Sequence, residues 1–440
     1  MALIGRLPRC QLLFRPLTKS LPILQSRTLI LRPPDHENRE YKTIFEVIDE
    51  LSMSVIGGPS TYDPEVYNKR RQELLKYVPA SQDELPYRRM LDSFDTAIIP
   101  LGSNKKIRDR YSTHLGGVRI GRLLEDMDIF AVHLVFKHTL IPDLPKDSMQ
   151  SPFSIVTALV DRIFVHGKLE MDQDIRMSGH VTWVGRSSAE STLILEQKRD
   201  NGDWVQVTEA SFVLVARDPL NTKGAVLNRL TCESDQEKAL FERGEQNTKA
   251  RKISSKDSLF KHPPSEHEKM LIHDFFIKTV DHSALSFKAR IKPENSVWME
   301  DAKLKNLVIC QPENRNRFNK IFGGFIMRQA FELAWANAYT FGRERPFIVY
   351  MDDISFEAPV EVGSLLYFNS QISFIHDKYV QVRVSAEVLE PTTGSLQVTN
   401  VFHYTFELRG GKPGQIIPKT YHEAMMYLNS RRHFLRSLDP

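Results

Sequence analysis

The chain has 440 residues, which is too long for one ordinary hydrophobic core and indicates two or three domains. Hydrophobic residues make up 41% of the sequence, charged residues 26%, and the formal net charge is +4, so the composition demands no nucleic-acid partner. No apolar run reaches the roughly 18 residues of a transmembrane helix. Cys10, Cys232 and Cys310 are too far apart for a metal motif or a disulfide framework, which fits a reducing compartment.

The first 34 residues carry basic residues between apolar ones and contain no acid before Asp35. This pattern predicts a mitochondrial transit peptide over residues 1–34 and a location in the matrix. A disordered basic arm is the alternative. The basic residues are Arg6, Arg9, Arg15, Lys19, Arg27 and Arg32.

Residues 35–90 read as an N-terminal helical segment without evident chemistry. Apolar residues recur at helical spacing from Tyr41 to Leu51, and Pro64 suits the first turn of a second helix that runs to Leu75.

Residues 91–219 are expected to form one α+β unit. A strand at 95–101 and a polar stretch at 102–113 precede an apolar helix at 118–136. Alternating or β-branched segments then predict consecutive antiparallel strands, at 154–165, 174–184, 188–197, 204–208 and 210–216. A helix followed by such a meander is typical of an antiparallel sheet wrapped around one buried helix.

Residues 220–284 are polar and are predicted to be a largely helical linker. A helix is expected at 234–245. Ser265 and Glu268 form a capping box before a second one. The basic stretch at 249–256 is interpreted as a solvated face, with contact to a phosphate-bearing ligand as the alternative.

The first unit recurs over residues 285–412, ahead of a C-terminal helix or tail at 413–440. Its strands are predicted at 307–310, 347–356, 364–375, 379–388 and 398–407, with a helix after the first. Residues 160–165 (VDRIFV) align with 351–356 (MDDISF). Two copies of one unit predict two sheets, which are expected to join edge to edge so that neither joined edge is exposed.

The second helix begins with Gly323 and Gly324 and is apolar on most of its surface. Glycine allows a close backbone approach, and the N-terminus of a buried helix offers free N–H groups to a carbonyl oxygen or an anion. Close packing against a neighbouring helix is the alternative reading.

Two patterns flank this helix: N-x-x-x-x-x-x-G-G before it, and P-V-x-V-G-S after the strand that follows. These two patterns resemble those of the mitochondrial double-hotdog acyl-CoA thioesterases. Seven further segments carry the same resemblance: RRMLDS, IPLGS, SPFSIVTALVD, SGHVTWVG, NKIFGGF, DDISFEAPVEVGSLL and PKTY. The resemblance covers most of residues 85–435. It implies a tandem double hotdog, hydrolysis of acyl-CoA to fatty acid and coenzyme A, and homo-oligomers of three double hotdogs.

The resemblance also implies a site that pairs an Asn, seven residues before the first glycine, with an Asp on the other unit's helix, seven after the second. In the second unit these positions hold Asn316 and Phe331. In the first unit, with Gly121 as the second glycine, they hold Thr113 and Asp128. One complete site per chain is therefore expected, from Asn316 and Asp128. The mirror pair, Thr113 and Phe331, is expected to be inactive.

A rival register takes Gly116 and Gly117 as the glycine pair, which puts Leu124 at the acid position. Glu332 is the alternative base if the register slips by one residue. Asn314 and Asn319 compete with Asn316 as loop amides, and a turn role is the alternative for Asn316 itself.

Thioester hydrolysis needs an activated water and a polarised carbonyl. Asp128 is expected to act as general base. The N–H groups of Gly323 and Gly324 are expected to stabilise the oxyanion, and Asn316 to orient water or thioester. No metal or organic cofactor is required. Four basic residues are candidates for the phosphates of coenzyme A, with solvated charge as the alternative: Arg317, Lys320, Arg343 and Arg345.

Other chemistries are disfavoured. Hotdog dehydratases use a catalytic His, and Phe322 stands before the glycine pair here. A serine hydrolase is disfavoured because G-x-S-x-G is missing. The remaining alternative is a double hotdog that binds acyl-CoA, or assembles with partners, without hydrolysis.

Overall fold

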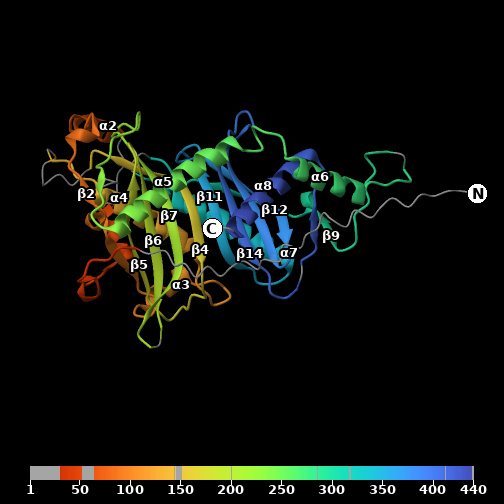
Figure 1. Cartoon of the computed structure of the whole chain (residues 1–440), viewed down its shortest axis with the longest axis horizontal. Coiled ribbons are helices and arrows are strands. Elements are labelled where there is room, and N and C mark those ends of the chain that lie inside the picture. The colour runs from red at the N-terminus through yellow and green to blue at the C-terminus, as the bar shows by residue number, and fades with distance from the viewer. Residues whose placement is uncertain are drawn as a thin grey trace, which may run out of the picture.

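A single eleven-stranded sheet runs through the protein, in the order β1-β3-β5-β6-β7-β4-β11-β14-β13-β12-β10 (Figure 1). The computed structural model describes residues 30–51, 64–142, 144, 151–199, 201–284, 286–316, 319–411 and 413–438. Most of the predicted transit peptide, residues 1–29, lies outside the described residues.

The strands from the first half of the chain lie next to one another at one end of this sheet, and the strands from the second half lie at the other end. The first half contributes β1 (Lys42–Thr43), β3 (Asp95–Ile99), β4 (Ser154–Val165), β5 (Ile175–Val184), β6 (Ser188–Lys198) and β7 (Trp204–Arg217). The second contributes β10 (Lys303–Ile309), β11 (Phe347–Phe356), β12 (Leu365–His376), β13 (Tyr379–Leu389) and β14 (Leu396–Glu407). Two small parallel pairs join β2 (Arg88–Arg89) to β8 (Leu230–Thr231) and β9 (Ser296–Trp298) to β15 (Gln415–Ile417).

Three expected boundaries were wrong. The strand expected at 307–310 begins at Lys303, because the four residues before Leu307 also pair with β12. The segments at 204–208 and 210–216 form one strand, because Glu209 pairs with Phe164 on one side and Ile194 on the other and so continues both ladders. The helix expected from Tyr41 begins at Ile44, because the two residues before it pair with β3 instead.

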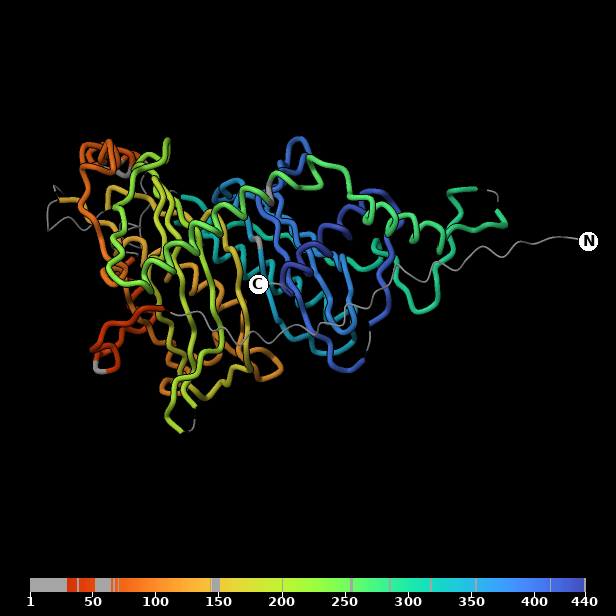
Figure 2. The backbone as a smooth tube through the Cα atoms, in the orientation of Figure 1, coloured from red at the N-terminus to blue at the C-terminus, as the bar shows by residue number. Residues whose placement is uncertain are grey.

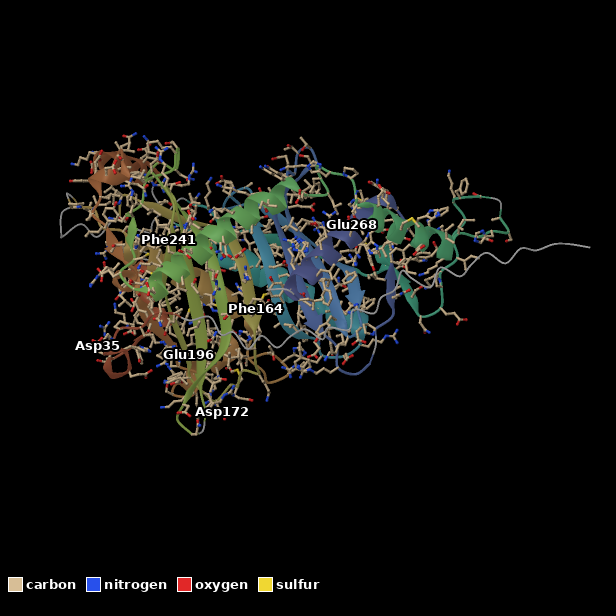
Figure 3. The ribbon with its side chains drawn as sticks, in the orientation of Figure 1. Asp35, Phe164, Asp172, Glu196, Phe241 and Glu268 are labelled. Atoms are coloured by element: carbon tan, nitrogen blue, oxygen red, sulfur yellow. The ribbon has the colours of Figure 1, made fainter. Side chains whose placement is uncertain are left out.

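The two halves join where β4 runs antiparallel to β11, which confirms the expected edge-to-edge union. Ile163 lies opposite Met351, and the rings of Phe164 and Tyr350 lie 4.6 Å apart between centroids. Phe164 therefore sits near the middle of the continuous sheet (Figure 3).

Two central helices, α4 (Ile120–His138) and α7 (Gly323–Gly342), pack against each other and against the sheet. α4 contacts β5 and β6, and α7 contacts β12 and β13. Apolar residues from both helices belong to one shared core with the strands. This arrangement confirms the tandem α+β double hotdog.

Two further helices, α5 (Asp235–Lys256) and α8 (Tyr421–Leu438), cross the face of the sheet that Figures 1 and 2 turn toward the viewer. α5 is longer than predicted and includes the basic stretch. That stretch is partly docked, because Arg251 forms ion pairs with Asp161 at 3.5 Å and Glu190 at 3.3 Å.

The remaining helices are α1 (Ile44–Leu51), α2 (Pro64–Leu74), α3 (Arg108–Tyr111) and α6 (Glu266–Thr279). The predicted capping box of α6 forms between Ser265 and Glu268. The Glu268 carboxylate also accepts two hydrogen bonds of 2.7 Å from Arg432 and so ties α6 to α8. None of the helices within the described ranges is long and apolar enough to span a membrane.

Candidate active site

The same loop precedes both central helices. In the first half the N–H of Thr113 donates to the carbonyl of Gly117 at 2.8 Å, and in the second the N–H of Asn316 donates to the carbonyl of Lys320 at 2.6 Å. In each loop the leading side chain accepts the return bond. Thr113 Oγ1 lies 3.1 Å from the Gly117 nitrogen, and Asn316 Oδ1 lies 3.2 Å from the Lys320 nitrogen. Thr113 and Asn316 therefore occupy equivalent positions.

This equivalence also decides between the two registers. Gly116 lies in the turn of the first loop with φ +75°, before α4 begins at Ile120, so it is not the counterpart of a helix glycine. Its counterpart is Asn319, with φ 58°, which gives that competing amide a turn role. The carbonyl of Asn314 accepts the N–H of Phe322 at 3.0 Å, so Asn314 helps to close the second loop.

Asp128 lies on α4 and faces the first turn of α7. Its Oδ2 accepts the backbone N–H of Gly324 at 2.7 Å, and its Oδ1 accepts the Thr157 hydroxyl at 2.6 Å. Asp128 is only 1% exposed. A buried carboxylate with both oxygens held by donors has a single orientation.

The electrostatic surroundings of Asp128 suit proton transfer near neutral pH. Burial is the largest influence on the pKa of Asp128 and raises it, the bonds from Thr157 and Gly324 lower it, and the nearby Glu125 raises it; together they place the pKa at about 6. A carboxylate with such a pKa is still ionised at neutral pH and is a stronger base than an exposed aspartate.

Both glycines are required by close contacts, as the interpretation of close packing against a neighbouring helix predicts. A Cβ atom on Gly324 would lie 2.9 Å from Cα of Glu125 and 3.0 Å from its carbonyl oxygen. A Cβ atom on Gly323 would lie 2.8 Å from the ring of Phe356 and 3.3 Å from Oδ2 of Asp128. The N–H of Gly324 is engaged by Asp128, whereas the N–H of Gly323 makes no hydrogen bond to any described residue.

Three acids close together on α4, Glu125, Asp126 and Asp128, form an acidic patch that is buried and compensated. Glu125 forms ion pairs with Arg122 of α4 at 2.7 Å and Arg328 of α7 at 2.9 Å. Asp126 accepts the Tyr111 hydroxyl at 2.6 Å. Asp128 is thus the acid of this patch that is held against the glycines.

The predicted phosphate contacts are not gathered at this site. Lys320 lies in the loop but forms an ion pair with Glu361, and Arg317 lies outside the described residues. Arg343 follows the 20-residue helix α7, about 30 Å along its axis from Gly323. Arg345 lines a cavity whose lining does not include Asp128. Neither arginine therefore lies beside Asp128.

The mirror position keeps a glycine, Gly121, as the counterpart of Gly324 but differs at the acid, at the loop residue and at the strand hydroxyl. Phe331 occupies the acid position and packs edge-on against Tyr404, with centroids 5.7 Å apart. Thr113 replaces Asn316. In the alignment of the two strands Ile348 takes the place of Thr157. The mirror site therefore lacks the hydrogen-bonding set of the first.

Glu332, the alternative base, belongs to the mirror side. Its carboxylate pairs with Arg119 at 2.7 Å and lies 3.2 Å from where a Cβ atom on Gly121 would be. Glu332 is thus close to Gly121, and its carboxylate is engaged by Arg119.

Thr157 was missed in the sequence, although it is the residue that orients Asp128 from the sheet. The available signal was a hydroxyl within the apolar strand 154–160, a few residues before the join of the two halves.

The family model of the Thioesterase superfamily matches residues 318–395, which include the glycines of α7. The mitochondrial acyl-coenzyme A thioesterase 9 of Homo sapiens is 44% identical over 410 residues, covering 93% of this chain and 92% of the human protein. The mitochondrial acyl-coenzyme A thioesterase 10 of Mus musculus is 43% identical and covers 86% of each chain. Among solved structures, an acyl-ACP thioesterase from Bacteroides thetaiotaomicron aligns over 73% of this chain and 100% of that chain, with 10% identity and a TM-score of 0.39.

Proposed function

Because this chain belongs to the acyl-coenzyme A thioesterase family, it is a hydrolase of acyl-CoA thioesters, and we propose that hydrolysis takes place at one composite site. The first half supplies Asp128 and Thr157 to this site. The second half supplies Asn316 and the glycine end of α7. The observation that carries the proposal is the buried Asp128 carboxylate, held at 2.7 Å by the N–H of Gly324.

In the proposed reaction Asp128 takes a proton from water as the water oxygen bonds to the thioester carbonyl carbon. The carbonyl oxygen becomes an oxyanion. When the intermediate collapses, the carbon–sulfur bond breaks, and the proton on Asp128 passes to the sulfur of coenzyme A. The products are a free fatty acid and the coenzyme A thiol, so protons and electrons balance.

The two glycines are given different roles. Gly324 is a positioning residue, because its N–H is engaged by Asp128. The N–H of Gly323, at the positive end of the α7 dipole, is assigned to the oxyanion. The Asn316 amide has both N–H donors and a carbonyl acceptor, and it therefore offers more donors than the single hydroxyl of a threonine. We assign Asn316 to orienting the water or the thioester.

The test is thiol release from acyl-CoA substrates of several chain lengths. The wild-type chain should release thiol, and Asp128→Asn and Asn316→Ala should lose most of this activity. Activity unaffected by both changes would refute the composite site. If the wild type released no thiol at any chain length, the alternative of an acyl-CoA-binding or assembly protein would be favoured.

The protein is assigned to mitochondria, and we propose the matrix as its compartment because the first 34 residues read as an import signal. We also propose that three chains assemble. The exposed apolar residues Leu307, 47% exposed, and Ile309, 55% exposed, on the edge strand β10 support a contact between copies. Analytical ultracentrifugation of the purified chain would test this, and a monomer at micromolar concentration would contradict it.

A further inference from the structure

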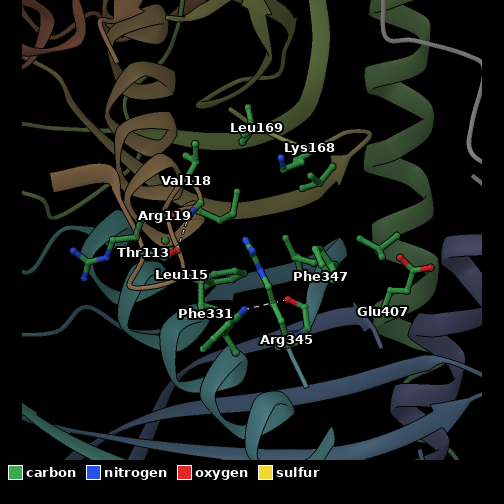
Figure 4. Close-up of a pocket in the computed structure, with 18 of the residues that line it drawn as sticks. Thr113, Leu115, Val118, Arg119, Lys168, Leu169, Phe331, Arg345, Phe347 and Glu407 are labelled. Atoms are coloured by element: carbon green, nitrogen blue, oxygen red, sulfur yellow. Dashed lines mark hydrogen bonds between the residues drawn. The ribbon is translucent and has the colours of Figure 1, made fainter. Parts of the chain in front are cut away.

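A cavity of about 990 Å³ opens on the mirror side of the two central helices (Figure 4). The loop at 112–121, α7, the end of β4 and the start of β11 enclose it. Small-molecule sites commonly have volumes of roughly 300–1,000 Å³, so the cavity is large enough for an extended ligand. Its apolar lining includes Leu115, Val118, Leu169, Phe331, Phe347 and Ile348.

Basic side chains outnumber acidic ones around this cavity. Among the residues that line it are three acids, Glu170, Glu332 and Glu407, each of which has a basic partner. The basic residues that line it are Arg119, Lys168, Arg345, Lys378 and Arg409. The surplus of positive charge favours an anionic ligand.

Arg345 is the basic residue whose charge is not compensated by any described acid. It extends into the cavity (Figure 4), and its guanidinium lies over the ring of Phe347, 5.3 Å from the centroid. One terminal nitrogen is 2.6 Å from where a Cβ atom on Gly117 would be, so the side chain reaches across to the loop that corresponds to the Asn316 loop. An arginine held in this way is suited to a phosphate group.

We propose that this cavity is a second, non-hydrolytic binding site for the ligand class of the catalytic site, an acyl-CoA or coenzyme A. Arg345 contacts the phosphates, and the apolar lining surrounding Phe331 and Ile348 receives the acyl or pantetheine portion. The inference rests on the proposed function, because the ligand class is taken from the activity of the composite site. The ligand is not cleaved there, because Thr113, Phe331 and Ile348 replace the groups that hold and assist the base.

The experiment is calorimetric titration of the full chain with a thioether analogue of acyl-CoA, which cannot be hydrolysed. The wild type should bind two equivalents per chain. Arg345→Gln should weaken one of the two by roughly tenfold or more, as expected for loss of a charge-assisted hydrogen bond. Ile348→Trp should abolish the same equivalent by filling the cavity. Arg343→Gln is the matched control, because Arg343 is an exposed arginine two residues away that does not line the cavity, and it should keep both equivalents.

Binding of only one equivalent of the analogue by the wild type would overturn the inference. Binding of two equivalents with wild-type affinity by both Arg345→Gln and Ile348→Trp would also overturn it. A second equivalent filled by ADP but not by the analogue would overturn it in favour of a free-nucleotide site. If the wild type released thiol from acyl-CoA substrates but bound only one equivalent of the analogue, the second site would be refuted and the proposed function would stand. Two bound equivalents without thiol release would refute the proposed function and leave two binding sites.

Discussion

The backbone N–H of Gly324 donates a hydrogen bond of 2.7 Å to Oδ2 of Asp128, although the two residues are 196 positions apart in the chain. This bond joins the proposed base on one central helix to the N-terminus of the other. The distance between the helices here is set by the missing Cβ of Gly324, which would otherwise meet the backbone of Glu125. In the proposed mechanism, catalysis therefore depends on how closely the two halves pack.

Asp128→Asn should lower kcat roughly 100- to 10,000-fold, the usual contribution of a general base. The amide is nearly isosteric, so binding of the thioether analogue should persist. Steady-state thiol release and the calorimetric titration measure the two effects. A variant with at least half of the wild-type kcat would exclude Asp128 as the base.

Thr157→Val should remove the 2.6 Å hydrogen bond to Oδ1 of Asp128 while conserving side-chain volume. Because this bond lowers the pKa of Asp128, its loss should move the midpoint of the pH–rate profile upward and reduce kcat by about tenfold. Thr157→Ser keeps the hydroxyl and should restore the midpoint. Identical profiles for the wild type and Thr157→Val would show that the hydroxyl does not act on the base.

The activity of the wild type should rise with pH through about 6 and then level off. The base must be ionised to accept a proton, and burial raises the pKa of Asp128 from its ordinary value to about 6. The dependence of kcat/KM on pH between 4.5 and 8 reports this ionisation in the free enzyme, in the span of roughly two units either side of the pKa. A profile that falls over this range would contradict a carboxylate base.

Gly324→Ala should destabilise the protein by about 1–3 kcal/mol, as expected for overpacking, because the new methyl group would meet the Glu125 backbone. It should also lower activity by moving the N–H that holds Asp128. Denaturant unfolding and thiol release measure the two consequences. Gly411→Ala is the matched control, since nothing lies within 4 Å of a Cβ atom there. Equal stability of the two variants would contradict the close approach of α4 and α7.

Thr113→Ala should leave kcat nearly unchanged, whereas Asn316→Ala should lower it by about 100-fold, in line with the loss of a polar group at the reacting centre. The two residues hold the same loop position in the two halves, so the comparison separates loop stability from catalysis. A large loss in Thr113→Ala would show that the mirror site also turns over substrate.

Much of this arrangement could be predicted because the sequence contains two copies of the same α+β unit. The periodicity of each strand is local, and most strand boundaries agree with the structure to within a few residues. The equivalence of Thr113 with Asn316 could also be inferred, because the loops before the helices keep one spacing. The Asn and Asp spacing that the family resemblance implies, applied to both copies, then pointed to Asp128.

The remaining features depend on contacts that no local pattern reports. The orientation of the Thr157 hydroxyl follows from how β4 lies against α4. Arg345 is close in sequence to α7 but reaches a cavity on the mirror side, since the direction of a side chain after a helix end is set by tertiary packing. Glu209 lies between two segments that were predicted as separate strands, and its pairing on both sides joins them into one.

The unequal loops and helices have a consequence for how the two halves can be paired. A dimer of two first halves would carry Thr113 opposite Asp128 at both of its sites, and a dimer of two second halves would carry Asn316 opposite Phe331. Neither assembly would regain the complete pair. On the proposed one-site model, neither half can therefore supply a working site by pairing with a copy of itself, and both halves are needed in one chain.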